Sequence, residues 1–327
     1  MTHAQDRVRS DRWWLAALIG CAAALGCHAA AGPSGPSARS APSGWPDALA
    51  RCRAVSGGAR WDAGFAIAST AEVSVGGMSG TSESIEDTRT GRHKATLRLG
   101  DGLAMSDGFD GAAWEQAIGG EIVTPDAPDA VALAATMRWM TARGYLRAGG
   151  ARYRELGARA LGDRRFHAVE AAPPGGAPIE LWLDDATGLL ARTVHRDGTN
   201  TVTTSYDDYR AVDGVTLPHL TVVDPGDPRN RATFRVTGIR LRPAVADSEL
   251  ARPRTDERLT FAGGAHATRL PFDLINNHIY IHARVDGQPV RMLVDTGGLN
   301  LLTPAAAARL GLASAGKLAG AGVGERK

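Results

Sequence analysis

Segments of alternating apolar and polar residues, separated by tight turns, fill most of the chain between residues 66 and 241. A period of two residues is typical of β-strands that bury one face, because successive side chains point to opposite sides of a sheet. The segments that we expect to be strands are Ala66–Val75, His93–Leu99, Ile179–Leu183, Leu189–His195, Thr201–Tyr209, Gly214–Val223 and Ala232–Leu241. Turns such as Asp184-Asp185-Ala186-Thr187-Gly188 join them at hairpin spacing, so the pattern predicts a mainly β domain with an antiparallel sheet.

Two segments depart from this alternation and favour helices. Trp45–Val55 suits a short helix. Pro128–Arg143 carries apolar residues at helical spacing, and Gly144 is expected to stop it.

Two of the predicted hairpins carry motifs of a known family. The motifs are Leu181-Trp182-Leu183-Asp184 with Thr187-Gly188-Leu189-Leu190, and Asp208-Tyr209-Arg210 with Asp213-Gly214-Val215-Thr216-Leu217-Pro218. Both resemble the LolA/LolB-like lipoprotein carriers. The resemblance covers residues 45–252 and implies a curved antiparallel half-barrel sheet with a covering helix, a fold that can hold an acyl chain. No acid–base or metal constellation stands out in this region, and we expect His167 and His195 to be structural or surface histidines.

The N-terminus has the pattern of an export signal. Three arginines precede Trp13–Leu25, an apolar run of about 13 residues that is too short to span a bilayer. Residues 1–27 end in Ala24-Leu25-Gly26-Cys27, which resembles the lipobox of bacterial lipoproteins and predicts lipidation of Cys27. Cys21, after Leu18-Ile19-Gly20, is the alternative, and plain secretion with cleavage near residues 29–31 is the third possibility. In each case we expect an exported protein, either periplasmic or membrane-anchored in the envelope.

Composition further restricts the class of protein and the kinds of partner that we expect. Residues 28–44 are almost entirely Ala, Gly, Pro and Ser, which predicts a disordered tether. Of the three cysteines, Cys52 has no expected partner, so a disulfide framework is excluded and Cys52 is expected to be a small buried side chain. A net charge of +2 without a basic run argues against a nucleic-acid partner.

The C-terminal part, residues 268–327, follows a polar linker, residues 253–267, and leads into an aspartate through a strand–turn–strand pattern. Small or branched apolar residues alternate with polar ones from Ile279 to Val285, which predicts a half-buried strand. Asp286-Gly287 predicts a tight turn, and Val290–Val294 is the expected return strand. It runs into Asp295-Thr296-Gly297-Gly298. Thr303 is then expected to cap a helix with Pro304 at its first position, and Gly311 to end it.

This order of strand, Asp-Thr-Gly turn, apolar stretch and short helix resembles the retropepsin-like aspartic proteases. The resemblance implies that Asp295 is the catalytic carboxylate and that the Thr296 hydroxyl braces the site, with Gly298 as the small residue that follows. Gly297 leaves room for backbone to approach the carboxylate. A plain turn between two strands is the alternative, because Asp, Thr and Gly all favour turns.

Aspartic proteolysis needs two carboxylates about 3 Å apart that share one proton. The chain holds one Asp-Thr-Gly, so the resemblance implies a homodimer in which each copy gives one aspartate to a peptide or protein substrate. No cofactor or metal is expected. His278 and His282 would lie about 13 Å apart along a strand, too far to share one ion.

The family's domain continues beyond a flap, and the Gly-rich stretch Ala319–Lys327 resembles the start of that flap, so we expect residues 268–327 to be a partial retropepsin-like β domain. The expectation is that the chain is a fragment without proteolytic activity as it stands. The alternative functions are an envelope lipid- or lipoprotein-binding module with a vestigial protease segment, and a purely structural lipoprotein.

Overall fold

The computed structural model describes residues 44–100, 103–116, 120–147, 150–253, 267–294 and 302–313. Chain contacts divide these described residues into two compact units, residues 44–253 and residues 267–313. The predicted signal and lipobox, the tether before Gly44 and most of the predicted linker also lie outside the described residues.

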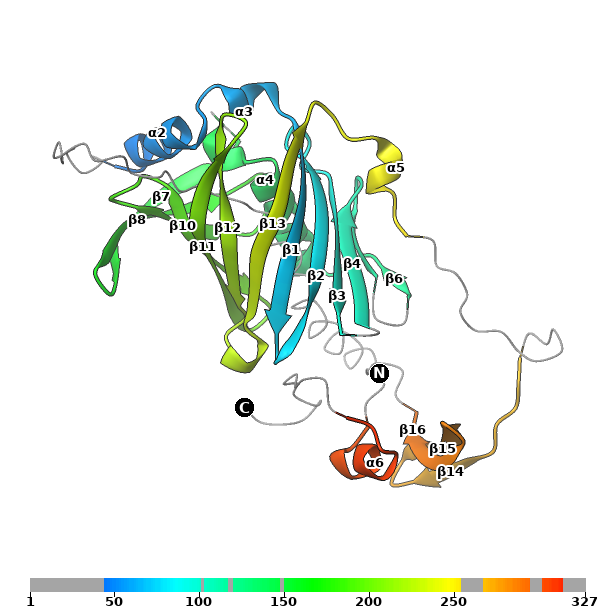
Figure 1. Cartoon of the computed structure of the whole chain (residues 1–327). Helices are drawn as coiled ribbons and strands as arrows, with labels where there is room; N and C mark the ends of the chain where they lie inside the picture. Colours follow the sequence, from blue (N-terminus) through cyan, green and yellow to red (C-terminus); the bar gives the residue numbers. More distant parts are fainter. Residues whose placement is uncertain are drawn as a thin grey trace. The chain divides into compact units, whose positions relative to one another are not determined.

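The first unit is built on one curved antiparallel sheet (Figure 1), which confirms the predicted mainly β fold class. Its described strands are β1 (Ala66–Val75), β2 (Met78–Asp87), β3 (His93–Leu99), β4 (Leu103–Phe109), β5 (Ala113–Gln116), β6 (Ile122–Val123), β7 (Arg152–Leu161), β8 (Arg164–Ala172), β9 (Ile179–Asp184), β10 (Leu190–Asp197), β11 (Asn200–Val212), β12 (Val215–Asp224) and β13 (Ala232–Arg242). The spatial order is β6-β5-β4-β3-β2-β1-β13-β12-β11-β10-β9-β8-β7. Two hairpin meanders are therefore joined where β1 pairs with β13.

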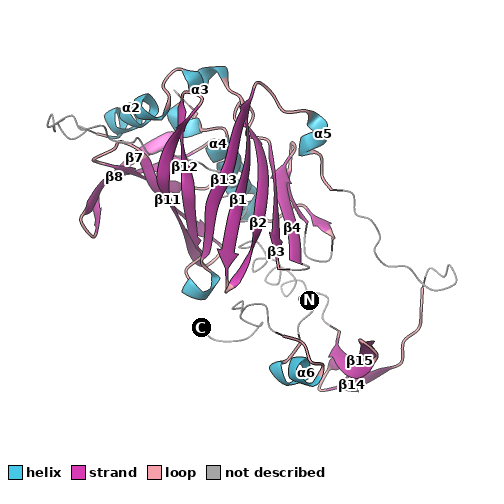
Figure 2. Cartoon of the chain, in the orientation of Figure 1, coloured by secondary structure: helices cyan, strands magenta, loops and turns pink. Residues whose placement is uncertain are grey.

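Short helices accompany this sheet (Figure 2): α2 (Trp45–Ser56), α3 (Arg60–Ala63), α4 (Pro128–Thr141) and α5 (Asp247–Leu250), with 3-10 turns η2 (Gly144–Leu146) and η3 (Pro228–Asn230). Helix α2 confirms the first predicted helix, and it contacts β7, β8, β9 and β12. Helix α4 confirms the second, but it ends at Thr141 because Arg143 turns into the left-handed region, with φ 55°. No helix in the described part of the chain is both long and apolar enough to cross a membrane.

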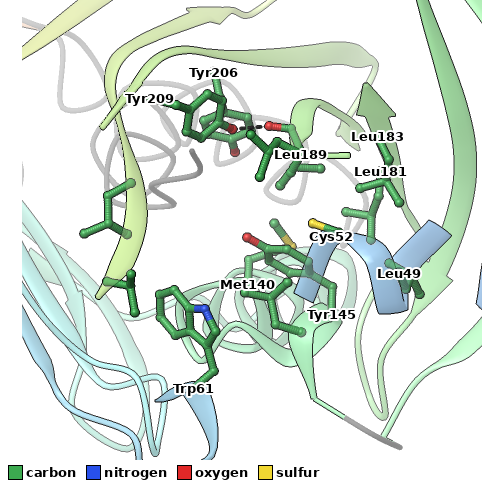
Figure 3. Packing of buried hydrophobic residues seen from close by; sticks show 14 of the residues in the cluster. Leu49, Cys52, Trp61, Met140, Tyr145, Leu181, Leu183, Leu189, Tyr206 and Tyr209 are labelled. Atoms are coloured by element: carbon green, nitrogen blue, oxygen red, sulfur yellow. Dashed lines mark hydrogen bonds between the residues drawn. The ribbon is translucent and has the colours of Figure 1, made fainter. Parts of the chain in front are cut away.

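The main core lies between α2, α3, α4 and η2 and one face of the sheet (Figure 3). Alternate residues of the strands enter it, such as Leu181 and Leu183 of β9, and they meet Leu49 and Cys52 of α2. The hydroxyl of Tyr209 donates a hydrogen bond to the backbone carbonyl of Leu190 inside this core. Cys52 is buried as predicted, and burial raises the pKa of its thiol to about 12.

The second unit contains a three-stranded antiparallel sheet, ordered β14 (Phe272–Ile275), β15 (His278–Val285) and β16 (Gln288–Leu293), followed by α6 (Pro304–Arg309). Two tight turns connect the strands. Asn276 and Asn277 have φ of 49° and 63°, and Asp286 and Gly287 have φ of 48° and 77°. Two successive positive φ values define type I′ turns, whose twist matches that of a hairpin. The turn predicted at Asp286-Gly287 is therefore confirmed.

Candidate functional site

The structure describes both sides of the predicted catalytic turn. Asp295, Thr296, Gly297 and Gly298 themselves lie outside the described residues, as do the predicted lipidation site Cys27 and its alternative Cys21. The site is therefore built from β15 and β16, which come before the turn, and from α6, which follows it.

The β15–β16 hairpin fixes the backbone up to the residue that precedes Asp295. Tyr280 lies opposite Leu293 at the end of the ladder. One further bond extends the pairing, since the backbone N–H of Val294 donates to the carbonyl oxygen of Ile279 at 2.8 Å. The direction in which the chain enters the Asp-Thr-Gly segment is thus set by hydrogen bonds to the neighbouring strand.

The chain that follows the segment is also anchored by local chemistry. Thr303 caps α6, as predicted, because its hydroxyl oxygen accepts a hydrogen bond from the N–H of Ala306 at 3.2 Å. Pro304 occupies the start of the helix, and Gly311 adopts φ 69° just after its end. The predicted helix is confirmed.

The small sheet is amphipathic, as the sequence predicts. The register places Phe272 opposite Ile281 and Leu274 opposite Ile279, so these apolar side chains share one face. The other face carries Leu293, which lies opposite Tyr280, and several polar side chains: His282 Nε2 lies 3.0 Å from Asp273 Oδ2, and Arg291 stacks on the ring of Tyr280 at 5.2 Å.

Much of the apolar face is open to solvent. Phe272 is 56% exposed and Leu274 is 65% exposed. Most of the exposed large apolar side chains among the described residues belong to this unit. Contiguous exposed apolar surface of this kind usually marks a contact with another molecule or segment.

Metal-binding geometry is not found in the described ranges, where no cluster of three or more His, Cys, Asp or Glu side chains could hold an ion. His167 and His195 lie on strands of the large sheet. His195 is buried, and its ring nitrogens have no hydrogen-bond partner within the described residues.

A buried charged pair in the large unit was not anticipated from the sequence. Arg143 Nη2 lies 2.9 Å from Glu86 Oε2, and both side chains are almost completely inaccessible. Burial raises the pKa of Glu86, and the charge of Arg143 opposes that rise. The guanidinium also lies over the ring of Trp61 at 5.9 Å and donates to the carbonyl oxygen of Thr141 at 2.7 Å. These contacts hold the end of α4 to the sheet, which is a structural role.

Residues 281–326 match the family described as aspartyl protease, a range that includes β16, the Asp-Thr-Gly segment and α6. No curated protein matches the chain. The C-terminal segment is therefore aspartyl protease-like.

Solved structures resemble the large unit at low identity. A domain described as an outer membrane lipoprotein-sorting protein, from Vibrio parahaemolyticus, has a TM-score of 0.41 and 14% identity, over 63% of this chain and 95% of that one. A LolA superfamily protein from Nitrosomonas europaea has a TM-score of 0.43 and 8% identity, over 64% of this chain and 99% of that one. The names of these two structures and of the matched family are those of the two groups that the sequence motifs resemble, the lipoprotein carriers and the aspartyl proteases.

Proposed function

We propose that residues 268–327 are part of an aspartic-type endopeptidase of the cell envelope, and that Asp295 supplies one of its two catalytic carboxylates. The observation that carries the proposal is the match of residues 281–326 to the aspartyl protease family. The hydrogen bond from Val294 to Ile279 supports it, because a catalytic side chain must be held by a rigid neighbouring element.

The chemistry follows from two carboxylates that share a proton. One carboxylate takes a proton from a bound water, which attacks the peptide carbonyl, and the other donates a hydrogen bond to the carbonyl oxygen. The pair titrates as a unit. In this proposal the Thr296 hydroxyl braces the turn, and Gly297 and Gly298 leave room for the backbone to approach.

The second carboxylate comes from Asp295 of a second copy, in a two-fold homodimer. The open apolar face around Phe272 and Leu274 supports an association of this unit with a partner surface. The substrate is a peptide or protein held between the two copies.

We propose the same domain ranges as those expected from the sequence. Residues 1–27 direct export, with lipid attachment at Cys27 or at Cys21, and residues 28–44 tether the folded part. Residues 45–252 form the LolA-like domain, residues 253–267 the linker and residues 268–327 the protease segment. The protein then works in the periplasm or at the envelope membrane.

The test is cleavage of unstructured peptides at acid pH by the longest polypeptide that the gene encodes. Asp295→Asn is expected to abolish cleavage, and pepstatin is expected to inhibit it. Asp286→Asn is the matched control. It removes a carboxylate from the same unit, at a turn position with φ 48° that Asn tolerates as well as Asp does. Cleavage that survives Asp295→Asn, or no cleavage at any acid pH, overturns the proposal.

The same purified proteins distinguish the alternative function, lipid or lipoprotein binding, from peptidase activity. An acyl ligand that can be extracted from the purified protein, together with full function of Asp295→Asn in cells, would favour a lipid- or lipoprotein-binding module. Neither result is expected if Asp295 is catalytic.

A further inference from the structure

The Arg143–Glu86 pair belongs to a larger group of buried charges. His93 lies directly opposite Glu86 in the β2–β3 ladder. Its Nε2 lies 3.8 Å from Oδ2 of Asp107 on β4, and its Nδ1 lies 3.1 Å from the carbonyl oxygen of Gly91. Both His93 and Asp107 are only 7% exposed. The four ionisable side chains are called the buried tetrad below: Arg143, Glu86, His93 and Asp107.

The buried residues of α4 all lie in the second half of the helix. They are Thr136, Met140 and Thr141. Met140 enters the main core (Figure 3), whereas Val131 in the first half is 48% exposed. The attachment of α4 to the sheet therefore depends mainly on its C-terminal end, which Arg143 follows.

That end of the helix rests on the strands that carry the tetrad. A Cβ at Gly91 would lie 2.3 Å from the carbonyl oxygen of Arg138, so the helix and the β2–β3 turn are in direct contact there. The guanidinium of Arg138 lies over the ring of Phe109 at 5.5 Å, and Phe109 is opposite His93 in the β3–β4 ladder. Movement of α4 away from the sheet would therefore open the tetrad to water.

One proton decides the net charge of the tetrad. Arg143 balances one carboxylate, and a proton held between His93 and Asp107 balances the other. Oε1 of Glu86 and Oδ1 of Asp107 have no hydrogen-bond partner within the described residues. Loss of the proton would therefore leave an uncompensated negative charge in a buried site, which is costly.

The pKa shifts agree with a proton that is held in this site. Burial by itself would lower the pKa of His93, but Asp107, the Gly91 carbonyl and the charge of Glu86 outweigh burial, so this pKa is raised above 6.5. Burial raises the pKa of Asp107, and His93 opposes that rise. The tetrad therefore binds more protons when α4 is docked than when it is hydrated. Docking is favoured in full below pH 6.5 and weakens as the pH rises through the raised pKa.

Other charged groups lie around the tetrad and α4. Burial and the charge of Asp129 on α4 raise the pKa of Asp197 to about 6, so its titration contributes little above pH 7. Of the described groups that face the tetrad, only His93 is of a type that ordinarily titrates between pH 6 and 8. The others are Glu115 opposite Asp107, Arg138 of α4, Tyr145 and Tyr206 near Arg143, and the Arg92–Asp247 and Arg242–Glu249 pairs that α5 makes beside β3.

We propose that α4 is a proton-controlled cover over the core-facing side of the large sheet. The proton between His93 and Asp107 keeps the helix docked, and loss of the proton releases it. Met137 of α4 packs against both hydrophobic clusters of the large unit, so release uncovers apolar surface on the sheet. The cover does not depend on the proposed peptidase chemistry, because all its residues belong to the large unit.

The test is amide hydrogen exchange of the full chain, measured by mass spectrometry from pH 7 to 8.5 and corrected for the intrinsic effect of pH on exchange. Peptides from residues 128–143 are expected to lose protection at least about threefold over this range, with a ceiling of about tenfold per pH unit for one proton. Peptides from β11 and β12 are expected to keep their protection, because they report on unfolding of the whole sheet.

Asp107→Asn is expected to abolish this pH dependence, because the tetrad is then neutral without the extra proton. His219→Gln is the matched control. His219 Nδ1 lies 3.0 Å from the carbonyl oxygen of Leu217, the same contact that His93 makes with Gly91, but His219 is on β12 and outside the tetrad. In this variant the pH dependence of the α4 peptides is expected to stay within about twofold of wild type.

Three results would overturn the proposal. The first is constant protection of the α4 peptides from pH 7 to 8.5 in the wild-type chain. The second is the same loss of protection in the β11 and β12 peptides, because that would assign the pH dependence to global unfolding. Both come from the wild-type chain and need no folded variant. The third is an unchanged pH dependence in Asp107→Asn, with the variant folded by circular dichroism.

Discussion

The backbone N–H of Val294 donates to the carbonyl oxygen of Ile279 at 2.8 Å, directly before the Asp-Thr-Gly segment. This bond depends on the hairpin that brings β16 back along β15, and the hairpin depends on the type I′ turn at Asp286 and Gly287. A substitution that strains the turn should therefore weaken the hydrogen bond of Val294, although the turn and Val294 lie at opposite ends of β16.

Gly287→Val tests this dependence. Gly287 has φ 77°, and a Cβ there would meet no atom within 4 Å, so the cost is backbone strain alone. For a side chain with a branched Cβ in the left-handed region that cost is about 1–2 kcal/mol. Amide hydrogen exchange at Val294 is expected to become faster by about tenfold. An unchanged rate of amide hydrogen exchange at Val294 would mean that the turn does not control the pairing at the end of β16.

Leu274→Asp tests whether the apolar face of the small sheet is an association surface. Leu274 is 65% exposed beside Phe272 and Ile279, and a carboxylate there would have to be desolvated on association. Sedimentation velocity is expected to show the dimer dissociation constant raised by at least about tenfold. His278→Asp is the control, because His278 lies on the opposite face of β15 and should leave association unchanged. Monomeric wild-type protein at all concentrations would contradict the expectation.

Arg143→Met tests the buried pair in the large unit. It leaves the carboxylate of Glu86 buried without its cation, which is expected to lower the free energy of unfolding by about 3–5 kcal/mol in urea titrations. The double variant Glu86→Leu with Arg143→Met should recover most of that loss. Arg154→Met is the control: Arg154 pairs with Glu170 at 2.8 Å but its side chain is 66% exposed, so solvent screens the pair and the loss is expected to be much smaller than for Arg143→Met. Equal losses in the free energy of unfolding for Arg143→Met and Arg154→Met would show that burial does not determine how much the Arg143–Glu86 pair matters for stability.

The sequence was most informative where the pattern is local. Alternation along β1, β3 and β12, and the Asp-Gly turn of the small sheet, depend on neighbouring residues only, and the structure has strands and turns there. Strand β2, by contrast, is Met78–Asp87 with few apolar residues, and no alternation marks it. It forms because it lies between β1 and β3, whose pairing satisfies its backbone on both edges.

Long-range features could not be predicted in this way. Arg143 at the end of α4 fits the ordinary preference for a cation at a helix C-terminus. Its burial depends on Glu86, 57 positions earlier, and no local pattern connects the two. A small pocket lined by Arg164, Phe166 and Arg192 likewise draws on five strands, β7, β8, β10, β11 and β12. For the protease segment, the sequence predicted both flanks of Asp295, and the arrangement of the Asp-Thr-Gly residues stays a prediction.

The stability of the large unit should fall in acid because of His195. Burial lowers the pKa of His195 to about 4, compared with an ordinary value near 6.5 in the unfolded chain. Between these values the unfolded chain binds more protons than the folded one, so stability is lost as the pH falls from about 6.5 to 4, by up to about 3 kcal/mol. His195→Leu should remove that part of the pH dependence in urea titrations.

Asp197 on the same strand provides a comparison of opposite sign. Burial raises the pKa of Asp197 to about 6, and the charge of Asp129 adds to the rise, so the folded state holds a proton that the unfolded chain releases. The contribution of Asp197 to folding stability therefore grows as the pH falls from about 6 towards 4. Asp197→Asn should steepen the loss of stability in acid, whereas His195→Leu should flatten it. The same slope for both variants would contradict the assignment of the acid sensitivity to His195.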